Sequence, residues 1–376
     1  MTRKSGDGTT PPTDDKAATH LKALRSQIDK LDLQILELLN KRAAIAGQIG
    51  RVKADQGGEV FSAAREEEVL QNVLSANQGP LGEVTVKSIF RELISGSRAL
   101  QKVQKIAFLG PLYSYSHLAA LERFGEAVAF NPTVSIASVF EEVVRKHADY
   151  GVVPLENSTD GRIADTLDMF VRTPQVKICA EIRLRVHHHL LANCPQSEIR
   201  RVYSKSQALS QCRTWLSKNL PQATVHPVAS TTDAAKLVQT DMNAAAVASR
   251  KAAVNYGINI LCHNIEDSPF NETRFAVIGP TDSARTGNDK TAMMFQISHT
   301  PGALADVLAI FKANKLNLTW IESFPCRDAK GEYVFFIDFD GHRDDPKVKK
   351  TIAAMQATCD AVHVLGSFPV AQPIDE

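Results

Sequence analysis

The sequence predicts a multidomain protein in which an all-α segment of three helices precedes an α/β domain and a βαββαβ, ferredoxin-like domain. Three observations support this order. An apolar heptad seam runs from Leu21 to Val52, strand and helix signals alternate from Lys105 onward, and the last segment repeats the order strand, helix, strand. We expect a disordered tail over 1–18 and domains over 19–104, 105–282 and 291–370.

The composition is that of an ordinary soluble protein. A formal net charge of +1 over 376 residues gives no electrostatic reason to expect nucleic acid or an anionic membrane as partner. The six cysteines form no CxxC pair, which argues against structural zinc and fits a reducing, cytoplasmic compartment. No apolar run reaches membrane-spanning length, and the polar tail lacks the apolar core of a signal peptide.

The first helix carries apolar side chains at spacings of three and four residues, which is typical of one long packed helix. Further helices are expected from Ser62, a plausible N-cap, and from about Val84 to Gln104. Three helices with one very long arm form a poor core in a single chain, so we expect an intertwined homodimer, or a tetramer if a second interface links dimers. The seam consists of Leu21, Leu24, Ile28, Leu31, Ile35, Leu38, Ile45, Ile49 and Val52.

Arg42 interrupts this seam with a guanidinium at a core-facing position. A charge there is costly unless an anion meets it, so either a carboxylate of a neighbouring helix or an anionic ligand is required. Ser97 and Gln101 likewise extend the apolar face of the third helix at helical spacing. Polar residues on apolar helix faces indicate a charged pocket inside a bundle.

The α/β segment places hydroxyl-rich loops after several predicted strands. Ligands in such folds bind where loops leave the carboxyl ends of strands, although Ser and Thr in these loops also cap helices. The loops are 114–117, 157–159 and 230–232. His187, His188 and His189 lie in RVHHHLLA, which we expect to be one strand with mixed faces rather than a metal site, and no Gly-rich phosphate loop indicates a nucleotide cofactor.

Five motifs in the expected order carry a resemblance to a known family. They are FLGPLYSYSHLAA (Phe108–Ala120), VVPLENSTDG (Val152–Gly161), NETRF (Asn271–Phe275), TPGAL (Thr300–Leu304) and IESFP (Ile321–Pro325). With the helical segment before them, the chain resembles the bifunctional chorismate mutase/prephenate dehydratases of phenylalanine biosynthesis, which end in an ACT regulatory domain. The resemblance implies a two-lobed, periplasmic-binding-like dehydratase core and no cofactor or metal.

For the mutase half, the resemblance implies a site that binds the chorismate dianion and stabilises charge on the breaking ether oxygen. Lys53 and Gln101 would act on the ether oxygen, and Glu66 would hold the substrate hydroxyl. The chain departs at Ser62, where the best-known mutase of the family has an aspartate, so we expect weaker substrate binding there. The carboxylate-binding residues would be Arg25 of the partner subunit, Arg42, Arg65 and Ser97.

For the dehydratase half, the resemblance implies that Thr273 donates a proton or hydrogen bond to the leaving hydroxyl of prephenate. Arg274 would point to the opposite side of an extended strand and is expected to be structural. A preference for arogenate over prephenate is a rival reading, and a non-enzymatic amino-acid sensor is a more distant one. Substrate binding would fall to Ser114, Asn157, Ser158, Tyr203, Gln207, Ser230 and Thr231.

For the ACT segment, the resemblance implies feedback inhibition by L-phenylalanine bound between paired domains. The chain departs from the family at Phe324, where an arginine is usual, which could alter the effector response. The expected effector-binding residues are Gly302, Ala303, Leu304, Glu322 and Ser323.

Overall fold

The computed structural model describes residues 14–56, 59–159, 161–325 and 333–375. Most of the expected disordered tail lies outside these ranges. Helix α1 (Asp14–Asp55) nevertheless begins before the predicted boundary at residue 19. The tail prediction was wrong for residues 14–18, because Ala17 and Ala18 are strong helix formers and nothing there interrupts a helix.

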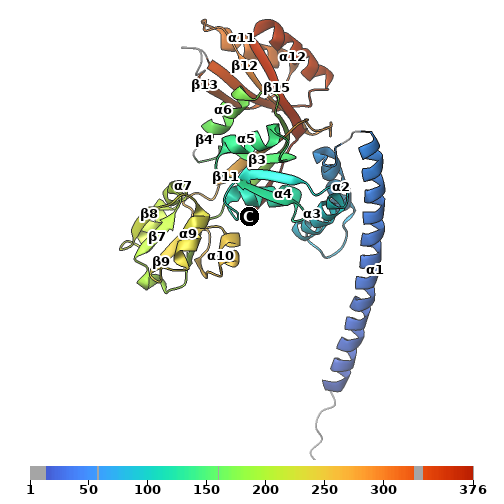
Figure 1. Cartoon of the computed structure of the whole chain (residues 1–376), viewed down its shortest axis with the longest axis vertical. Helices are drawn as coiled ribbons and strands as arrows, with labels where there is room; N and C mark the ends of the chain where they lie inside the picture. The colour runs from blue at the N-terminus through green and yellow to red at the C-terminus, as the bar shows by residue number, and fades with distance from the viewer. Residues whose placement is uncertain (1–13, 57–58, 160, 326–332, 376) are drawn as a thin grey trace, which may run out of the picture.

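The N-terminal domain consists of α1, α2 (Ala63–Ala76) and α3 (Glu83–Ala99), so the prediction of three helices is confirmed. The third helix was predicted too long: Gln101 lies in the turn that follows α3. Ser62 caps α2 as predicted, since its hydroxyl accepts a hydrogen bond from the Arg65 backbone N–H at 3.3 Å. Figure 1 shows α1 packed beside α2 and α3 over its C-terminal part, with the rest projecting away from the body.

The seam of α1 stays open in the single chain. Its apolar side chains are about half exposed, for example Leu31 at 55% and Ile35 at 53%. An apolar stripe of this length is expected to be covered in solution by another surface. The prediction that this helix needs a partner therefore keeps its physical basis.

The α/β domain has two lobes, each built on one sheet. The first sheet has the order β16-β5-β11-β3-β1-β2, with β4 paired to β3. Helices α4 (Tyr115–Phe124), α5 (Ile136–Val144) and α6 (Ala164–Arg172) belong to this lobe. Its strands are β1 (Lys105–Leu109), β2 (Ala129–Thr133), β3 (Tyr150–Asn157), β4 (Gly161–Arg162), β5 (Lys177–Arg185), β11 (Glu272–Gly279) and β16 (Pro373–Asp375).

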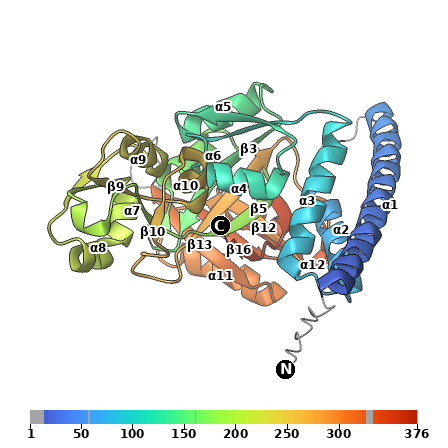
Figure 2. The same ribbon diagram turned by 90° about the horizontal axis from the view of Figure 1, so that it is seen from below.

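The second lobe has the strand order β10-β6-β9-β7-β8. Figure 2 shows the first lobe between this second lobe and the N-terminal helices. The helices of the second lobe are α7 (Ser206–Gln211), α8 (Arg213–Asn219), α9 (Thr231–Val238) and α10 (Arg250–Tyr256). Its strands are β6 (His189–Ala192), β7 (Arg201–Ser204), β8 (Thr224–Pro227), β9 (Ala244–Ala248) and β10 (Ile260–Cys262).

The segment RVHHHLLA is not one strand, and that prediction was wrong. Strand β5 ends at Arg185 in the first sheet, and β6 begins at His189 in the second. Residues 186–188 instead cross between the lobes beside the returning segment. There the Val186 N–H donates to the Asn271 carbonyl at 2.8 Å, and the Ile265 N–H donates to the His188 carbonyl at 2.7 Å.

The C-terminal domain has the predicted βαββαβ order. Its sheet runs β13-β14-β12-β15, and every neighbouring pair is antiparallel. The short strand β16 that follows was not predicted, and it returns the chain to the first-lobe sheet. The elements are β12 (Asp289–Gln296), α11 (Ala303–Asn314), β13 (Leu318–Pro325), β14 (Tyr333–Asp340), α12 (Pro346–Thr358) and β15 (Ala361–Pro369).

The two faces of this sheet pack against different partners. Met293 and Phe295 contribute to a core with α11 and α12, while Met294 and Phe324 join a core shared with Phe140 of the first lobe. Phe324 is buried and lies edge-on to Phe336 at a centroid distance of 6.4 Å. Phe324, the position at which the sequence departs from the motif it resembles, is therefore part of the core between the two domains.

Arg274 joins the same two domains by charge. It is buried on β11 and forms ion pairs with Glu181 of β5 and Asp338 of β14. Its guanidinium also lies 5.6 Å from the ring centroid of Trp320 on β13. The prediction of a structural Arg274 that points away from Thr273 is confirmed.

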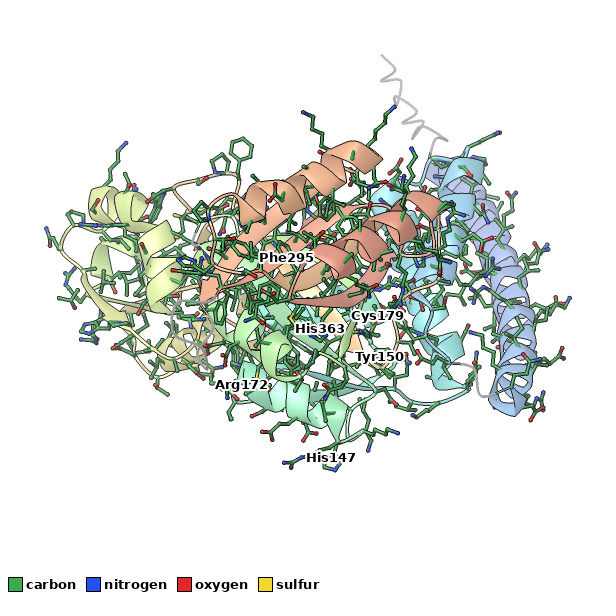
Figure 3. The ribbon with its side chains drawn as sticks, turned by 90° about the horizontal axis from the view of Figure 1, so that it is seen from above. His147, Tyr150, Arg172, Cys179, Phe295 and His363 are labelled. Carbon is green, nitrogen blue, oxygen red and sulfur yellow. The ribbon has the colours of Figure 1, made fainter. Side chains whose placement is uncertain are left out.

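The N-terminal domain is held to the first lobe by buried charges. Glu66 of α2 pairs with Arg98 of α3 at 3.1 Å and with Arg123 of α4 at 3.5 Å. Near them, the Tyr150 hydroxyl donates to Glu59 at 2.9 Å. Figure 3 shows Tyr150 and Cys179 next to each other on the side of the first lobe that faces the N-terminal helices.

We predict that Arg274→Ala lowers the free energy of unfolding by about 3–5 kcal/mol, because removal of one partner leaves buried carboxylates without a counter-charge. The shift of the urea midpoint measures this effect. Arg145→Ala is the matched control, since its pair with Glu141 is exposed and worth less than about 1 kcal/mol. Equal midpoints for the two variants would contradict a supporting role for Arg274.

Candidate active sites

A cleft of about 840 Å³ lies between the two lobes of the α/β domain. It opens where loops leave β1, β3 and β7, at the strand ends that the sequence indicates. Six of the predicted dehydratase residues line it: Ser114, Asn157, Gln207, Ser230, Thr231 and Thr273.

Thr273 and Asn157 are brought together by strand register, because they are paired residues of β11 and β3. The Asn157 amide nitrogen donates to the Thr273 hydroxyl oxygen at 2.9 Å. The Thr159 backbone N–H donates to the Asn157 amide oxygen at 3.0 Å, which orients the amide with its nitrogen toward Thr273. Thr273 thus accepts from Asn157 and can offer its own hydrogen to a group in the cleft.

Two further amides in this cluster were not predicted. Gln211 lies one turn after Gln207 on α7 and donates to the Asn157 oxygen at 3.4 Å, while its own oxygen accepts from Asn271 at 3.1 Å. Asn271 belongs to the NETRF motif, but its role was not anticipated. The i, i+4 spacing of the two glutamines was the available signal.

His188 was considered only as an unlikely metal ligand, and the structure places it behind this cluster. It is buried and lines the cleft, and its Nε2 lies 2.8 Å from the Gln211 amide oxygen. Burial lowers the pKa of its imidazole, against the opposing effect of the Gln211 hydrogen bond. Among the described residues, no cluster of three His, Cys, Asp or Glu side chains could hold a metal ion.

Lysines supply the positive charge among the described residues that line the cleft. Lys236 pairs with Asp233 at 3.2 Å, and Lys205 stands at the N-cap of α7 with an exposed side chain. Neither lysine was predicted, because each is an ordinary surface residue in the sequence. Lys205 offers a charge for a substrate carboxylate.

Two residues that the sequence assigns to substrate binding lie outside the cleft lining. The Tyr203 hydroxyl donates to Asp241 at 3.1 Å, and Arg201 holds the same carboxylate. Ser158 donates to the Phe270 carbonyl at 2.7 Å and lines a separate cavity of about 230 Å³ beside Trp320. Residue 158 neighbours Asn157 on an extended segment, so its side chain takes the other face.

The predicted mutase residues gather where α1 meets α2 and α3. Arg42 donates to the Ser97 hydroxyl at 3.0 Å, and Gln101 donates to the Ala46 carbonyl at 3.1 Å. Burial and the nearby charge of Arg65 lower the pKa of Arg42. Lys53 lies about three turns after Arg42 on the same face of α1 and donates to the Glu59 carbonyl at 3.0 Å.

Two predicted mutase residues are placed elsewhere. Glu66 is buried against Arg98 and Arg123, at the junction of two domains. The sequence reading missed this because Arg123 comes from a different domain. Arg25 is exposed and separated from Arg42 by about 25 Å of continuous helix, at 1.5 Å of rise per residue.

The predicted effector residues divide between two places. A cavity of about 340 Å³ is lined by Gly302, Ala303 and Leu304, together with Thr300, Tyr333 and Phe335. Gly302 precedes α11 at a φ of 89°, a conformation that favours glycine. Glu322 instead pairs with Arg162 of β4 at 3.0 Å, and neither it nor the neighbouring Ser323 lines this cavity.

Comparisons with known proteins agree with this arrangement. Residues 24–102 match the family Chorismate mutase type II, and residues 106–283 match the family Prephenate dehydratase. The bifunctional chorismate mutase/prephenate dehydratase of Stutzerimonas stutzeri is 42% identical over 361 residues, which cover 94% of this chain and 99% of that protein. That of Aquifex aeolicus is 42% identical over 93% of this chain and 98% of its own length.

A solved structure supports the same conclusion. The prephenate dehydratase of Arthrobacter aurescens, in complex with L-Phe, has a TM-score of 0.67 and 32% identity, covering 72% of this chain and 92% of that one. No helix in the described part of the chain is long and apolar enough to cross a bilayer.

The two family matches and the relatives that are 42% identical over nearly the whole chain lead to one conclusion. The chain belongs to the bifunctional chorismate mutase/prephenate dehydratases and carries both enzyme activities.

Proposed function

We propose that the cleft between the lobes converts prephenate to phenylpyruvate with Thr273 as the hydrogen donor. As the ring carboxylate departs as carbon dioxide, its bonding electrons form the aromatic ring and expel the ring hydroxyl, which leaves as water once protonated. The hydrogen bond from Asn157 to Thr273 is the observation that carries this proposal, since the threonine oxygen serves as its acceptor and the threonine hydrogen stays available to a group in the cleft.

Threonine is a weak acid, so its contribution depends on position rather than on its pKa. Asn157, Gln207, Ser114, Ser230 and Thr231 surround the space in which the substrate would lie. Ser230 also caps α9, where its hydroxyl accepts from the Asp233 N–H at 2.9 Å, so it binds substrate only as a secondary role.

The rival substrate is arogenate, in which an ammonium group replaces the keto group of prephenate. Prephenate carries two negative charges, whereas arogenate carries a net charge of one. Because Lys205 forms no ion pair among the residues that the structure describes, its charge is available to a second substrate carboxylate, and the cleft favours the doubly charged prephenate.

We also propose that the mutase site forms in a homodimer in which Arg25 acts in the partner subunit. The exposed apolar seam and the distance between Arg25 and Arg42 along α1 support this arrangement. Arg42, Arg65 and Ser97 would hold the carboxylates of chorismate, with Lys53 and Gln101 at the ether oxygen. Ser62 lies three residues before Arg65, and its hydroxyl already accepts a hydrogen bond as the N-cap of α2.

The C-terminal domain is proposed to bind L-phenylalanine and inhibit the dehydratase. The cavity beside α11 has the size for an amino acid, and its Gly302, Ala303 and Leu304 lining agrees with the expected residues. Glu322 would contribute to this inhibition through its ion pair with Arg162, which joins the C-terminal domain to the first lobe. We place the enzyme in the cytoplasm, in keeping with its free cysteines and its biosynthetic substrates.

We predict that Thr273→Ala lowers kcat for prephenate by about 100-fold, because a positioned donor at a leaving group contributes roughly that factor. Thr273→Ser keeps the hydroxyl and should retain most of the activity. Phenylpyruvate release from prephenate measures the effect, and chorismate consumption by the same preparations reports folding of the mutase. An active Thr273→Ala enzyme would refute the assignment.

Subunit mixing tests the contribution of Arg25 from the partner. We expect Arg25→Ala and Arg42→Ala each to abolish mutase activity while the dehydratase stays active. When the two variants are mixed and re-equilibrated, random pairing should restore about a quarter of the wild-type activity, because half the dimers regain one intact site of two. No recovery in demonstrably mixed dimers would mean that Arg25 does not act in trans.

Gly302→Val tests the effector site. Its Cβ branches strain a left-handed backbone position and intrude on the cavity, so we expect basal dehydratase activity to persist while inhibition by L-phenylalanine is lost. Activity is followed across a titration for which binding is measured in parallel by calorimetry. If activity of the unmodified enzyme stays flat at saturating L-phenylalanine, feedback inhibition is absent.

A further inference from the structure

A continuous chain of polar side chains leads from the dehydratase cleft into the crossing between the lobes. It runs from Thr273 through Asn157, Gln211 and His188 to Tyr115. The successive contacts are 2.9 Å, 3.4 Å, 2.8 Å and 2.9 Å. The first four residues are buried, so their hydrogen bonds are made within the protein. A change in the orientation of one side chain therefore changes which atom it presents to the next.

The orientation of this polar chain follows from one backbone group. The Thr159 N–H can only donate, so the atom that it meets at 3.0 Å is the oxygen of Asn157. That oxygen also meets the Gln211 amide at 3.4 Å, so the Gln211 nitrogen faces Asn157 and its oxygen faces His188. An amide oxygen cannot donate, so His188 must carry a hydrogen on Nε2.

The far side of His188 is fixed by the crossing segment. Its backbone N–H donates to Glu266 at 2.9 Å, and its carbonyl accepts from Ile265 at 2.7 Å. Its Nδ1 lies 2.9 Å from the Tyr115 hydroxyl, whose single hydrogen is directed at Nδ1 when Nε2 carries the ring hydrogen; the His187 carbonyl, 2.7 Å from the same hydroxyl, is the alternative acceptor. Main-chain contacts therefore hold the imidazole with Nε2 directed at Gln211.

We propose that His188 is a positioning residue of the dehydratase reaction: its Nε2–H holds the Gln211 amide so that Asn157 donates to Thr273 and the threonine hydrogen stays directed at the substrate. If Gln211 turned over, its oxygen would face the Asn157 oxygen, and the two would repel. Asn157 can relieve this repulsion only by turning over as well, which gives up the hydrogen bond from the Thr159 N–H and presents an oxygen to Thr273, where it would accept the hydrogen needed for the leaving group. This inference rests on the proposed role of Thr273.

Two isosteric replacements separate the two ring nitrogens. The amide of His188→Gln reaches the Nε2 position and can still donate to Gln211, whereas His188→Asn is shorter and reaches only the Nδ1 position. We expect His188→Asn to lower kcat for prephenate by about 10- to 100-fold with little change in KM, since misplacement of a catalytic group by about 1 Å has this effect. His188→Gln should keep kcat within about threefold.

His189→Asn is the matched control. His189 is also a buried histidine at the start of β6, but its Nδ1 accepts from the Asn264 N–H, apart from the polar chain. We expect its kcat to remain near that of the unmodified enzyme. Mutase activity of every variant, measured in the same preparation, reports whether the whole protein is folded.

A double-mutant cycle with Thr273→Ala tests whether His188 acts through the threonine. If it does, His188→Asn costs nothing further in kcat once Thr273 is removed. Equal losses from His188→Asn in both backgrounds, or equal losses from His188→Gln and His188→Asn, would overturn the inference. Full activity of Thr273→Ala alone would instead overturn the proposed function of Thr273, so the two failures are distinguishable.

Discussion

The alternation of side chains along β11 is the constraint on which both the cleft and the attachment of the C-terminal domain depend. Thr273 points into the cleft and pairs with Asn157 across the sheet. Its neighbour Arg274 points the other way and enters the C-terminal domain, where it meets Asp338. A shift of register by one residue would turn Thr273 toward the C-terminal domain and Arg274 toward the cleft, so the buried ion pairs and the hydrogen bond between Asn157 and Thr273 stabilise the same register.

This geometry makes the C-terminal domain part of the catalytic lobe rather than an attached module. One face of its sheet completes a core with Phe140 and contains Phe324. Where β15 passes β5, a Cβ at Gly366 would lie 2.2 Å from the Ile178 carbonyl oxygen, so the backbones approach more closely than side chains would permit. Because the two backbones are in direct contact, a movement of this sheet is transmitted to the strands behind the cleft.

The mutase half obeys a different constraint. Its dehydratase counterpart closes a cleft within one chain, but α1 leaves its apolar seam exposed over most of its length. The charges of Glu66, Arg98 and Arg123 hold α2 and α3 to the first lobe and leave α1 as the element available to a second subunit. Arg65 lies close enough to Arg42 to lower its pKa, and among the described residues Arg65 pairs with Glu68 on the exposed side while no ion pair joins Arg42 to a carboxylate.

By itself the sequence determined the order and type of the elements, because the spacing of apolar residues and the turn residues act locally. The interrupted apolar seam also indicated Arg42, and the resemblance of the sequence motifs to a known family indicated Thr273 and Asn157. Only the tertiary structure decided the partners of Glu66 and the place of Tyr203 and Ser158. It likewise showed Gln211 and His188 behind Thr273. Such residues meet across two lobes or two domains, and hydrogen bonds between segments far apart leave no periodic trace in a sequence.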